Sequence, residues 1–230
     1  MRWLRRVAAE AGDLARAAVA ELVPPLCVVC DRRLAPGERW VCAGCDRAVS
    51  DGAGLRIKRI GLAGRGRLEA RYGLAYGPEV AGIITEMKYR GKPGLAGYLA
   101  RLLWEATGGD AAPGDVFVPV PMHPSRRRER GFNQAEELGR HLAGLAGATC
   151  AGGALRKAGN TACQAGLARD ARLTNVAGSI RVRDARGLEG RRVILVDDVV
   201  TTGATFRECA LALAGHGIGD VSAWAVASSA

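Results

Sequence analysis

Two adjacent acids followed by a threonine- and glycine-rich turn are the residues of this chain best suited to chemistry. Asp197 and Asp198 follow the apolar run Val193–Val196, and the turn Thr201–Thr205 comes next, before a helix. Backbone amides and hydroxyls at the start of a helix suit a dianionic phosphate. Carboxylates repel that phosphate, but they accept hydrogen bonds from neutral hydroxyls or help to hold a divalent cation. A phosphate beside two vicinal hydroxyls describes a ribose 5-phosphate, which we expect to bind here.

The turn itself, which we call the phosphate loop, has one residue with a special backbone. Gly203 lets the main chain approach a phosphate because it has no Cβ in the way. The alternative is an ordinary strand that ends in a polar turn with an N-capping threonine. One acid would mean little, but both acids followed by TTGAT are far more specific, so we favour ligand binding. The other members of the loop are Thr201, Thr202, Ala204 and Thr205.

A second charged segment, a basic loop, follows the apolar run Val116–Pro121. Arginine presents a bidentate fork to phosphate oxygens, so we expect this loop to attract pyrophosphate or a nucleic-acid backbone. A solvated charge run is the alternative, but this loop and the phosphate loop should lie on the same edge of one sheet. Lys88 is a further cation that we expect at the anion site, unless its stem packs in the interior. The arginines of the loop are Arg126, Arg127, Arg128 and Arg130.

Four cysteines near the start of the chain are spaced as metal ligands. Each pair is separated by two residues and can hold one side of a metal ion, and four thiolates satisfy tetrahedral zinc. Because no export signal is evident, paired cysteines indicate metal ligands rather than disulfides, and we expect a cytoplasmic protein. Four thiolates leave no open position, so the zinc should be structural. The four residues are Cys27, Cys30, Cys42 and Cys45.

The elements that must position these residues alternate between strands and helices from Glu69 onward. Continuous apolar, β-branched runs separated by helices predict an α/β fold with a parallel sheet covered on both faces. The expected strands are Arg71–Tyr76, Val116–Pro121, Thr149–Leu155, Ala177–Val182, Arg192–Val199 and Val221–Ser228. The expected helices are Val80–Arg90, Leu95–Thr107, Asn133–Ala146 and Ala204–His216.

Composition and charge set the wider organisation. A chain of 230 residues can bury one sizeable core and still carry a small module. We expect an amphipathic N-terminal helix over 1–24, a four-cysteine zinc module over 25–50, and the main domain over 68–230, with Ser50–Arg67 as a linker or irregular edge. Charged residues interrupt the first helix, so neither export nor a transmembrane segment is expected. The net charge of +10 favours polyanionic partners such as phosphorylated metabolites, nucleic acid or anionic lipid.

Two sequence motifs resemble a known family. The run VILVDDVVTTGAT resembles the phosphoribosyl pyrophosphate signature of type I phosphoribosyltransferases. The run VPVPMHPSRRRERGFNQAEELGRHL is very similar to the signature of the ComF family of competence-associated, phosphoribosyltransferase-like proteins. The cysteine pairs, the element Met87–Tyr89, and Gln164 followed by Arg169 and Asn175 also fit that family, so the resemblance spans about Pro24 to Val226.

The resemblance implies a type I phosphoribosyltransferase fold with phosphoribosyl pyrophosphate and magnesium at the sheet edge. Asp197 and Asp198 would contact the ribose hydroxyls, and Thr201–Thr205 would wrap the 5-phosphate. Pyrophosphate would lie at the basic loop. The stretch Asn160–Asn175 would fall in the mobile hood or loop that covers the substrate. Candidate equivalents of the basic residue and threonine of that region are Arg156, Lys157 and Thr161.

One departure bears on the chemistry. In members of the hypoxanthine–guanine type, the position of Thr201 is an aspartate that acts near the base. This chain has threonine there, which puts that particular base chemistry in doubt.

Two functions from different classes remain open. The first is an enzyme, a phosphoribosyltransferase (a glycosyltransferase) that displaces magnesium pyrophosphate from the anomeric carbon in favour of an unknown acceptor. Such chemistry needs positioned charge rather than a protein nucleophile, so no catalytic residue is assigned. The second, implied by the family, is a protein that handles single-stranded DNA in natural transformation, with other DNA-uptake proteins as partners. The charge of +10 fits it, whereas the low aromatic content of 5% weighs against base stacking.

Overall fold

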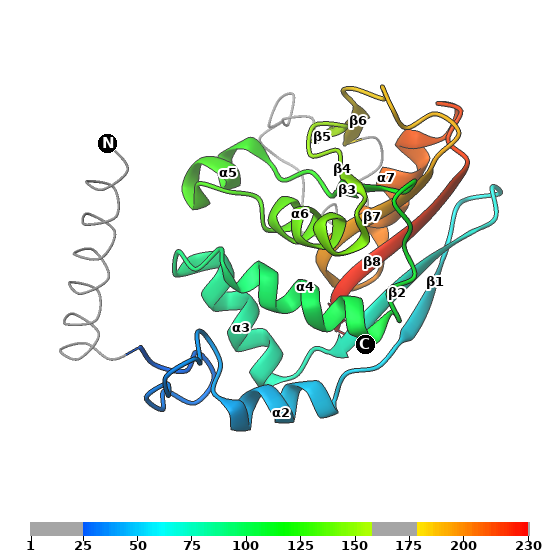
Figure 1. Cartoon of the computed structure of the whole chain (residues 1–230). Coiled ribbons are helices and arrows are strands. Elements are labelled where there is room, and N and C mark those ends of the chain that lie inside the picture. Colours follow the sequence, from blue (N-terminus) through cyan, green and yellow to red (C-terminus); the bar gives the residue numbers. More distant parts are fainter. Residues whose placement is uncertain (1–24, 158–178, 230) are drawn as a thin grey trace, which may run out of the picture. The chain divides into compact units, whose positions relative to one another are not determined.

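The computed structural model describes residues 25–157 and 179–229, which form two compact units divided between Asp51 and Gly52 (Figure 1). The expected N-terminal helix over 1–24 and the expected hood segment Asn160–Asn175 lie outside the described residues. In the first unit, three of the cysteines precede helix α2 (Ala43–Asp51), and Cys45 lies in its first turn. None of the described helices is long and apolar enough to cross a membrane.

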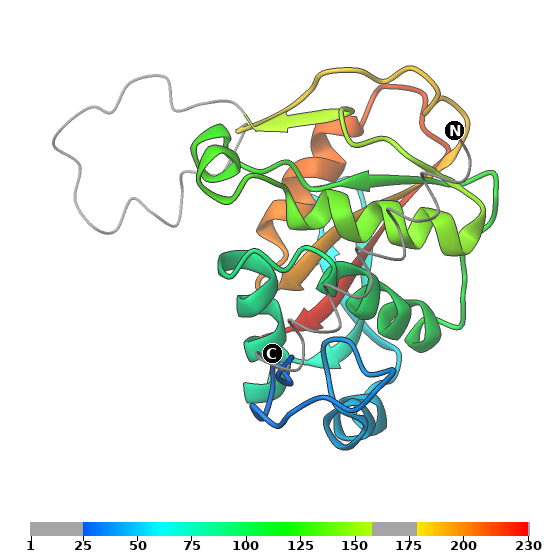
Figure 2. The same cartoon turned by 60° about the vertical axis from the view of Figure 1, so that its left-hand side comes forward.

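The second unit is built on a mixed sheet whose strands run mostly in parallel. The strand order is β1-β2-β8-β7-β3-β4, and only the pair β1–β2 is antiparallel. The arrows of the central strands run the same way in Figure 2. The strands are β1 (Arg56–Gly61), β2 (Arg67–Ala75), β3 (Val116–Pro119), β4 (Thr149–Cys150), β7 (Arg192–Val200) and β8 (Asp220–Ser228). A separate antiparallel pair consists of β5 (Leu155–Lys157) and β6 (Ile180–Val182).

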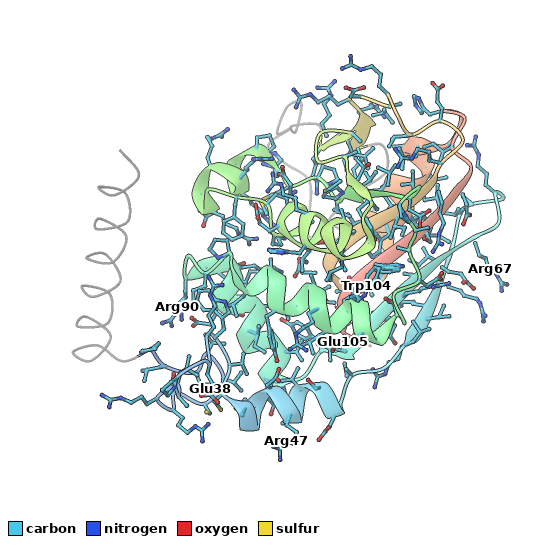
Figure 3. All side chains as sticks on the ribbon, in the orientation of Figure 1. Glu38, Arg47, Arg67, Arg90, Trp104 and Glu105 are labelled. Atoms are coloured by element: carbon cyan, nitrogen blue, oxygen red, sulfur yellow. The ribbon has the colours of Figure 1, made fainter. Side chains whose placement is uncertain are left out.

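Helices cover the two faces of this sheet. Successive residues of a strand point to opposite faces, so Ala223 and Trp224 of β8 mark the two sides. Trp224 lies 6.2 Å from Trp104, measured between ring centroids, on the face covered by α3 (Pro78–Tyr89), α4 (Leu95–Ala106) and α6 (Gln134–Ala146) (Figure 3). Ala223 packs with Phe206 on the face covered by α7 (Ala204–Leu213). The expected fold class, a sheet flanked by helices with a four-cysteine module, is confirmed.

The core explains why the apolar runs became central strands. Val193–Val196 and Val116–Val118 are almost fully buried, as continuous apolar strands in a two-sided sheet should be. Trp224 is also fully buried, and Phe117 meets its ring edge-on at 5.7 Å between centroids. Burying a large aromatic side chain stabilises the fold by about 1.5–3 kcal/mol. The strands that carry the candidate site are therefore held in place by a well-packed core.

The stretch Ser50–Arg67, expected as a linker or an irregular edge, lies at the edge of the sheet and forms a regular strand there. It contains β1, an edge strand that pairs with β2 across a turn in which Gly64 and Gly66 have positive φ angles of 86° and 90°. The strand RIKRIG buries only Ile60, so its apolar signal is too weak to recognise in the sequence.

Two further expectations need correction. The basic loop is helix α5 (Pro124–Arg130), because the His123 side chain accepts the Ser125 N–H at its start and Gly131 closes it in the left-handed conformation. The expected strand Thr149–Leu155 is divided between β4 in the main sheet and β5 in the separate pair. Strand β7 (Arg192–Val200), in contrast, matches the expected strand Arg192–Val199 and includes both acids.

Candidate functional site

The carboxyl ends of β3 and β7 form the switch point of the sheet. These strands are neighbours, but the chain leaves β3 through α5 and α6 towards β4, and it leaves β7 through α7 towards β8 on the other side. Ligands of open α/β sheets bind where consecutive connections diverge in this way. The phosphate loop follows β7 and α5 follows β3, so both predicted anion-binding segments start from this edge (Figure 1).

The two acids lie within β7, just beyond the last residue of β3. The pairing of β3 with β7 ends at Pro119 opposite Val196, whereas β7 continues beside β8 with Asp197 opposite Ala225. Asp198 is buried and Asp197 is half-buried, although their carboxyl groups interact with each other. The acids are therefore not equivalent, although the sequence places them side by side.

Asp198 is buried beside α3 and α6. Its side chain is 4% exposed and pairs with the ammonium of Lys88 through Oδ2. Oδ1 accepts a hydrogen bond of 3.1 Å from Nε2 of Gln134, the first residue of α6. Lys88, predicted among the cations of the anion site, thus lies directly against one of the predicted acids.

The same network continues to the end of α5. Nη1 of Arg130 donates to Oε1 of Gln134 at 3.2 Å, and Nη2 donates to the hydroxyl of Tyr89 at 2.8 Å. The Arg130 guanidinium also lies over the Tyr89 ring, 4.6 Å from its centroid. Arg130 is therefore joined to Lys88 through Gln134 and Asp198, and α3, α5 and α6 meet at this edge.

Asp197 has a different environment. Its carboxyl is half-buried, and Oδ1 accepts the backbone N–H of Asp198 at 2.9 Å. Burial raises the pKa of the Asp197 carboxyl well above its ordinary value, and the Asp198 carboxylate raises it further. No cation in the described part of the chain forms an ion pair with it. An acid held under such conditions is a candidate for ligand contact.

The phosphate loop has a backbone that only glycine adopts easily. Gly203 has a φ of 79°, and a Cβ there would lie 2.6 Å from Cγ1 of Ile60. The loop turns into α7 at Ala204, whose N–H donates to Oγ1 of Thr202 at 3.3 Å. The first amides of a helix lack partners within it, so this end is suited to an anion. Thr201 and Thr202 are exposed, Gly203 is buried, and Ala204 and Thr205 are half-buried.

Two residues at the loop come from strand β1 and were missed in the sequence. Ile60 packs against Gly203, and the Lys58 ammonium donates to the Thr201 carbonyl. Gln134 was also missed as a partner of Asp198, although it lies within the family motif. The signal that could have identified Lys58 and Ile60 is the alternation of side chains in the segment RIKRIG. Residues two apart in a strand lie on the same face.

The remaining cations of α5 are less constrained. Arg127 Nη2 pairs with Glu136 Oε2 at 3.1 Å. Arg126 and Arg128 are exposed, and no partner is found for either in the described part of the chain. On the far side of the sheet, β6 contacts α7 and places Lys157 of β5 beside that helix, whereas Thr161 lies outside the described residues.

The four cysteines form a separate cluster in the first unit. The Sγ atoms of all four lie within 4.8 Å of one another. Tetrahedral zinc with bonds of about 2.3 Å separates its sulfur ligands by about 3.8 Å, and Cys30 Sγ lies 3.7 Å from Cys42 Sγ. The Cys42 N–H donates to Cys27 Sγ at 3.4 Å, and such amide contacts support bound thiolates. The residues present therefore fit a structural zinc ion.

Known proteins place the chain in a family. No family model matches it. The DNA utilization protein YhgH of Escherichia coli strain K12 is 30% identical over 222 residues, which cover 88% of this chain and 96% of that protein. YhgH of Salmonella typhi is similar to the same extent. The chain belongs to the ComF family. The Competence protein F of Haemophilus influenzae is 30% identical over 114 residues, 49% of this chain and 50% of that protein.

Solved structures similar to this ComF-family chain are adenine phosphoribosyltransferases. One of them is 14% identical, and the match covers 80% of this chain and 89% of that enzyme's chain, with a TM-score of 0.39. The enzyme of Saccharomyces cerevisiae is 13% identical. The match covers 81% of this chain and 89% of that enzyme's chain, with a TM-score of 0.37.

Proposed function

We propose that this protein binds phosphoribosyl pyrophosphate with magnesium at the switch point of the sheet, and transfers its phosphoribosyl group to an acceptor that stays unidentified. One observation carries the proposal. The left-handed Gly203 turn opens α7 next to Asp197, a partly buried acid with no described cation partner. An anion cradle beside an acid without a described cation partner matches a phosphate with neighbouring hydroxyls.

The phosphate loop is suited to the 5-phosphate. Thr201 and Thr202 are exposed hydroxyl donors, and the first amides of α7 point out of the helix towards the loop. The helix dipole adds favourable potential at this end, worth about 0.3–1 kcal/mol for an exposed anion. Lys58 contributes a positive charge through its contact with the Thr201 carbonyl. These groups favour an anion without requiring a protein nucleophile.

The leaving group would be held by cations and metal. Arg126 and Arg128 of α5 have free guanidinium groups in the described structure, and arginine binds phosphate oxygens in a bidentate manner. Magnesium is usually held by one or two carboxylates together with substrate phosphates, and Asp197 offers the oxygen chemistry that it prefers. When bound, magnesium would neutralise the charge that develops on pyrophosphate.

Calorimetry with phosphoribosyl pyrophosphate and magnesium tests the proposal. Each hydrogen bond to a charged group is worth about 1.5–3 kcal/mol, so Asp197→Asn/Asp198→Asn should weaken binding by about tenfold or more. Asp220→Asn is the matched control, because Asp220 is an exposed acid at the start of β8, on the opposite edge of the sheet. Equal affinity in the parent and in the double variant would contradict the proposal.

The second candidate function is single-stranded DNA binding, and a specific observation favours it. Tyr89 is 63% exposed, and the Arg130 guanidinium covers one face of its ring, which leaves the other face for a base. Stacking of this kind is worth about 1–3 kcal/mol per base. The names of the similar proteins, which refer to DNA utilization and competence, support this candidate. Its partners would then be other DNA-uptake proteins.

Salt titration distinguishes DNA binding at α5 from weak charge attraction. Arg126→Ala/Arg128→Ala removes two cations without described partners, so the fold should be unaffected. The slope of log affinity against log salt concentration for a single strand should fall by about 0.7 for each arginine removed. Arg186→Ala, on the loop before β7, is the control. A slope unchanged by the α5 substitutions would place DNA elsewhere.

A further inference from the structure

We propose that the amino-terminal end of the sheet carries a second binding site, which takes a small molecule through its phosphate or carboxylate group. A cavity of about 390 Å³ opens there, where β2, β7 and β8 begin. Its volume is within the range of small-molecule sites. Asp197 lies roughly 17 Å further along β7 than the cavity residue Arg192, at the rise of an extended strand. The cavity is therefore separate from the switch point.

The strand register brings three arginines to this cavity. Arg71 of β2 lies opposite Trp224 of β8, and Arg192 of β7 lies opposite Asp220, four residues before Trp224. Alternate residues of a strand share a face, so these side chains lie on the face of the sheet that holds Trp224. Arg67, four residues before Arg71, completes the set. Guanidinium groups bind phosphate and carboxylate oxygens as forks, so the lining suits an oxyanion.

Two buried donors that line the cavity have no hydrogen-bond partner in the described part of the chain. They are the hydroxyl of Ser222, a residue only 9% exposed, and Nε of Arg71. A third such donor, the indole Nε1 of Trp224, belongs to the residue opposite Arg71 in the register. Buried polar groups nearly always have partners, and an Arg Nε or an indole N–H can only donate. Donors gathered in this way indicate a ligand that is rich in acceptor atoms.

Two acids of the cavity oppose a bound anion only weakly. Glu69 is paired with Arg59, with 3.5 Å between Oε1 and Nε. Asp220 is exposed, so solvent and salt screen its charge. Arg67 is exposed as well, and no partner for its guanidinium is found among the described residues. Arg67 is thus the cation of the cavity that is available to a ligand at once.

The third acid, Asp110, already occupies the place that we assign to the anionic group of the ligand. Its carboxylate accepts a hydrogen bond from Nη1 of Arg71 and lies 3.5 Å from Nη2 of Arg192. The hydrogen bond from Arg71 lowers the pKa of the Asp110 carboxyl, so this group is charged at neutral pH. Its side chain is 49% exposed, on the loop between α4 and β3. An oxyanion that enters the cavity would replace this carboxylate at the two arginines.

Calorimetry of the full chain with inorganic phosphate and with succinate tests the site. The phosphate loop is also proposed to bind phosphate, so the parent should show two phosphate sites. One should be lost in Gly203→Ala, and the other should be weakened about tenfold in Arg67→Gln. Asp110→Asn removes the competing carboxylate and should strengthen the second site several-fold. Arg186→Ala, outside the cavity, is the control and should leave both sites unaltered.

Ser222→Ala tests the buried donor without removing a charge. It deletes a hydroxyl that has no described partner, so thermal stability without ligand should not fall, whereas the affinity of the second site should. Binding of either probe at an Arg67-sensitive site supports the inference and assigns the ligand to the phosphate or the carboxylate class. Weaker binding in Asp110→Asn would overturn it.

The failure of this inference is distinguishable from the failure of the proposed function. A single phosphate site that is lost in Gly203→Ala and unaffected by Arg67→Gln would overturn the inference and leave the phosphate loop as proposed. A single site that is weakened by Arg67→Gln and unaffected by Gly203→Ala would support the inference and contradict the proposed function.

Discussion

At the scale of single residues, the charged form of Asp197 destabilises the folded protein, and no described cation forms an ion pair with it. Its pKa is raised by burial and by the neighbouring Asp198 carboxylate, so the folded protein binds a proton there more tightly than the unfolded chain does. Its contribution to stability is thus greatest below the ordinary pKa of aspartate, and it is lost as pH rises through the folded pKa. A residue retained at such a cost is typical of a functional site.

Asp197→Asn should therefore stabilise the protein near neutral pH. The substitution removes a charge that the folded state disfavours, and each 1 kcal/mol gained raises Tm by about 2–4 °C in a unit of this size. Thermal unfolding of the parent and the variant, followed by circular dichroism from acidic to neutral pH, measures the effect. The difference should grow with pH and be smallest in acid. A variant less stable than the parent at neutral pH would contradict this view of Asp197.

Gly203 presents a second residue-scale test, because two separate penalties apply to a side chain there. A Cβ would have to adopt a φ of 79° and would also meet Ile60. We expect Gly203→Ala to destabilise the protein by about 1–3 kcal/mol, measured by urea unfolding. Ile60→Ala removes the steric part only. The double variant should therefore be more stable than the sum of the single changes predicts, and simple additivity would refute the packing contact.

At the scale of elements, the four-cysteine segment should depend on metal. Its sulfur atoms fit zinc, and the segment has little core of its own, since its described buried apolar residues are few. We expect purified protein to carry about one zinc ion per chain and Cys42→Ser to lose most of it. Elemental analysis measures the metal, and the Cys150→Ser variant is the control, because Cys150 lies in β4 outside the cluster. Absence of zinc in the parent would contradict a structural metal site.

Sequence patterns predicted some elements better than others. Arg192–Val199 and Val116–Pro121 were recognisable because their long apolar runs are buried on both faces of the sheet. Strand β1 was not, since it lies at an edge and buries one residue. Helix α5 was mistaken for a loop because it buries nothing, so it has no apolar pattern to reveal it.

At the scale of the whole molecule, the sequence predicted which segments gather at one edge but not how they pair. Parallel strands bring the phosphate loop and the basic segment together, and this follows from strand order alone. The pairing of Lys88 with Asp198 joins residues far apart in the chain. No local pattern encodes such a contact, since it depends on how α3 and α6 pack on the sheet.

The net charge of +10 now has a partial structural account. Arg126 and Arg128 remain without described partners on α5, whereas Arg127, Arg130 and Lys88 are held by neighbouring groups. Free cations beside the switch point provide a field that steers phosphorylated ligands towards it. The same field attracts nucleic acid, so a single surface can serve both candidate functions.

The most direct test of the ribose-phosphate site is a crystal structure with phosphoribosyl pyrophosphate and magnesium. We predict the 5-phosphate within hydrogen-bond distance of the amides of Thr201–Thr205, with the ribose hydroxyls at Asp197 and with Lys88 still paired to Asp198. A ligand bound only along Arg126–Arg128, or a phosphate loop that stays empty at saturating ligand, would contradict the account.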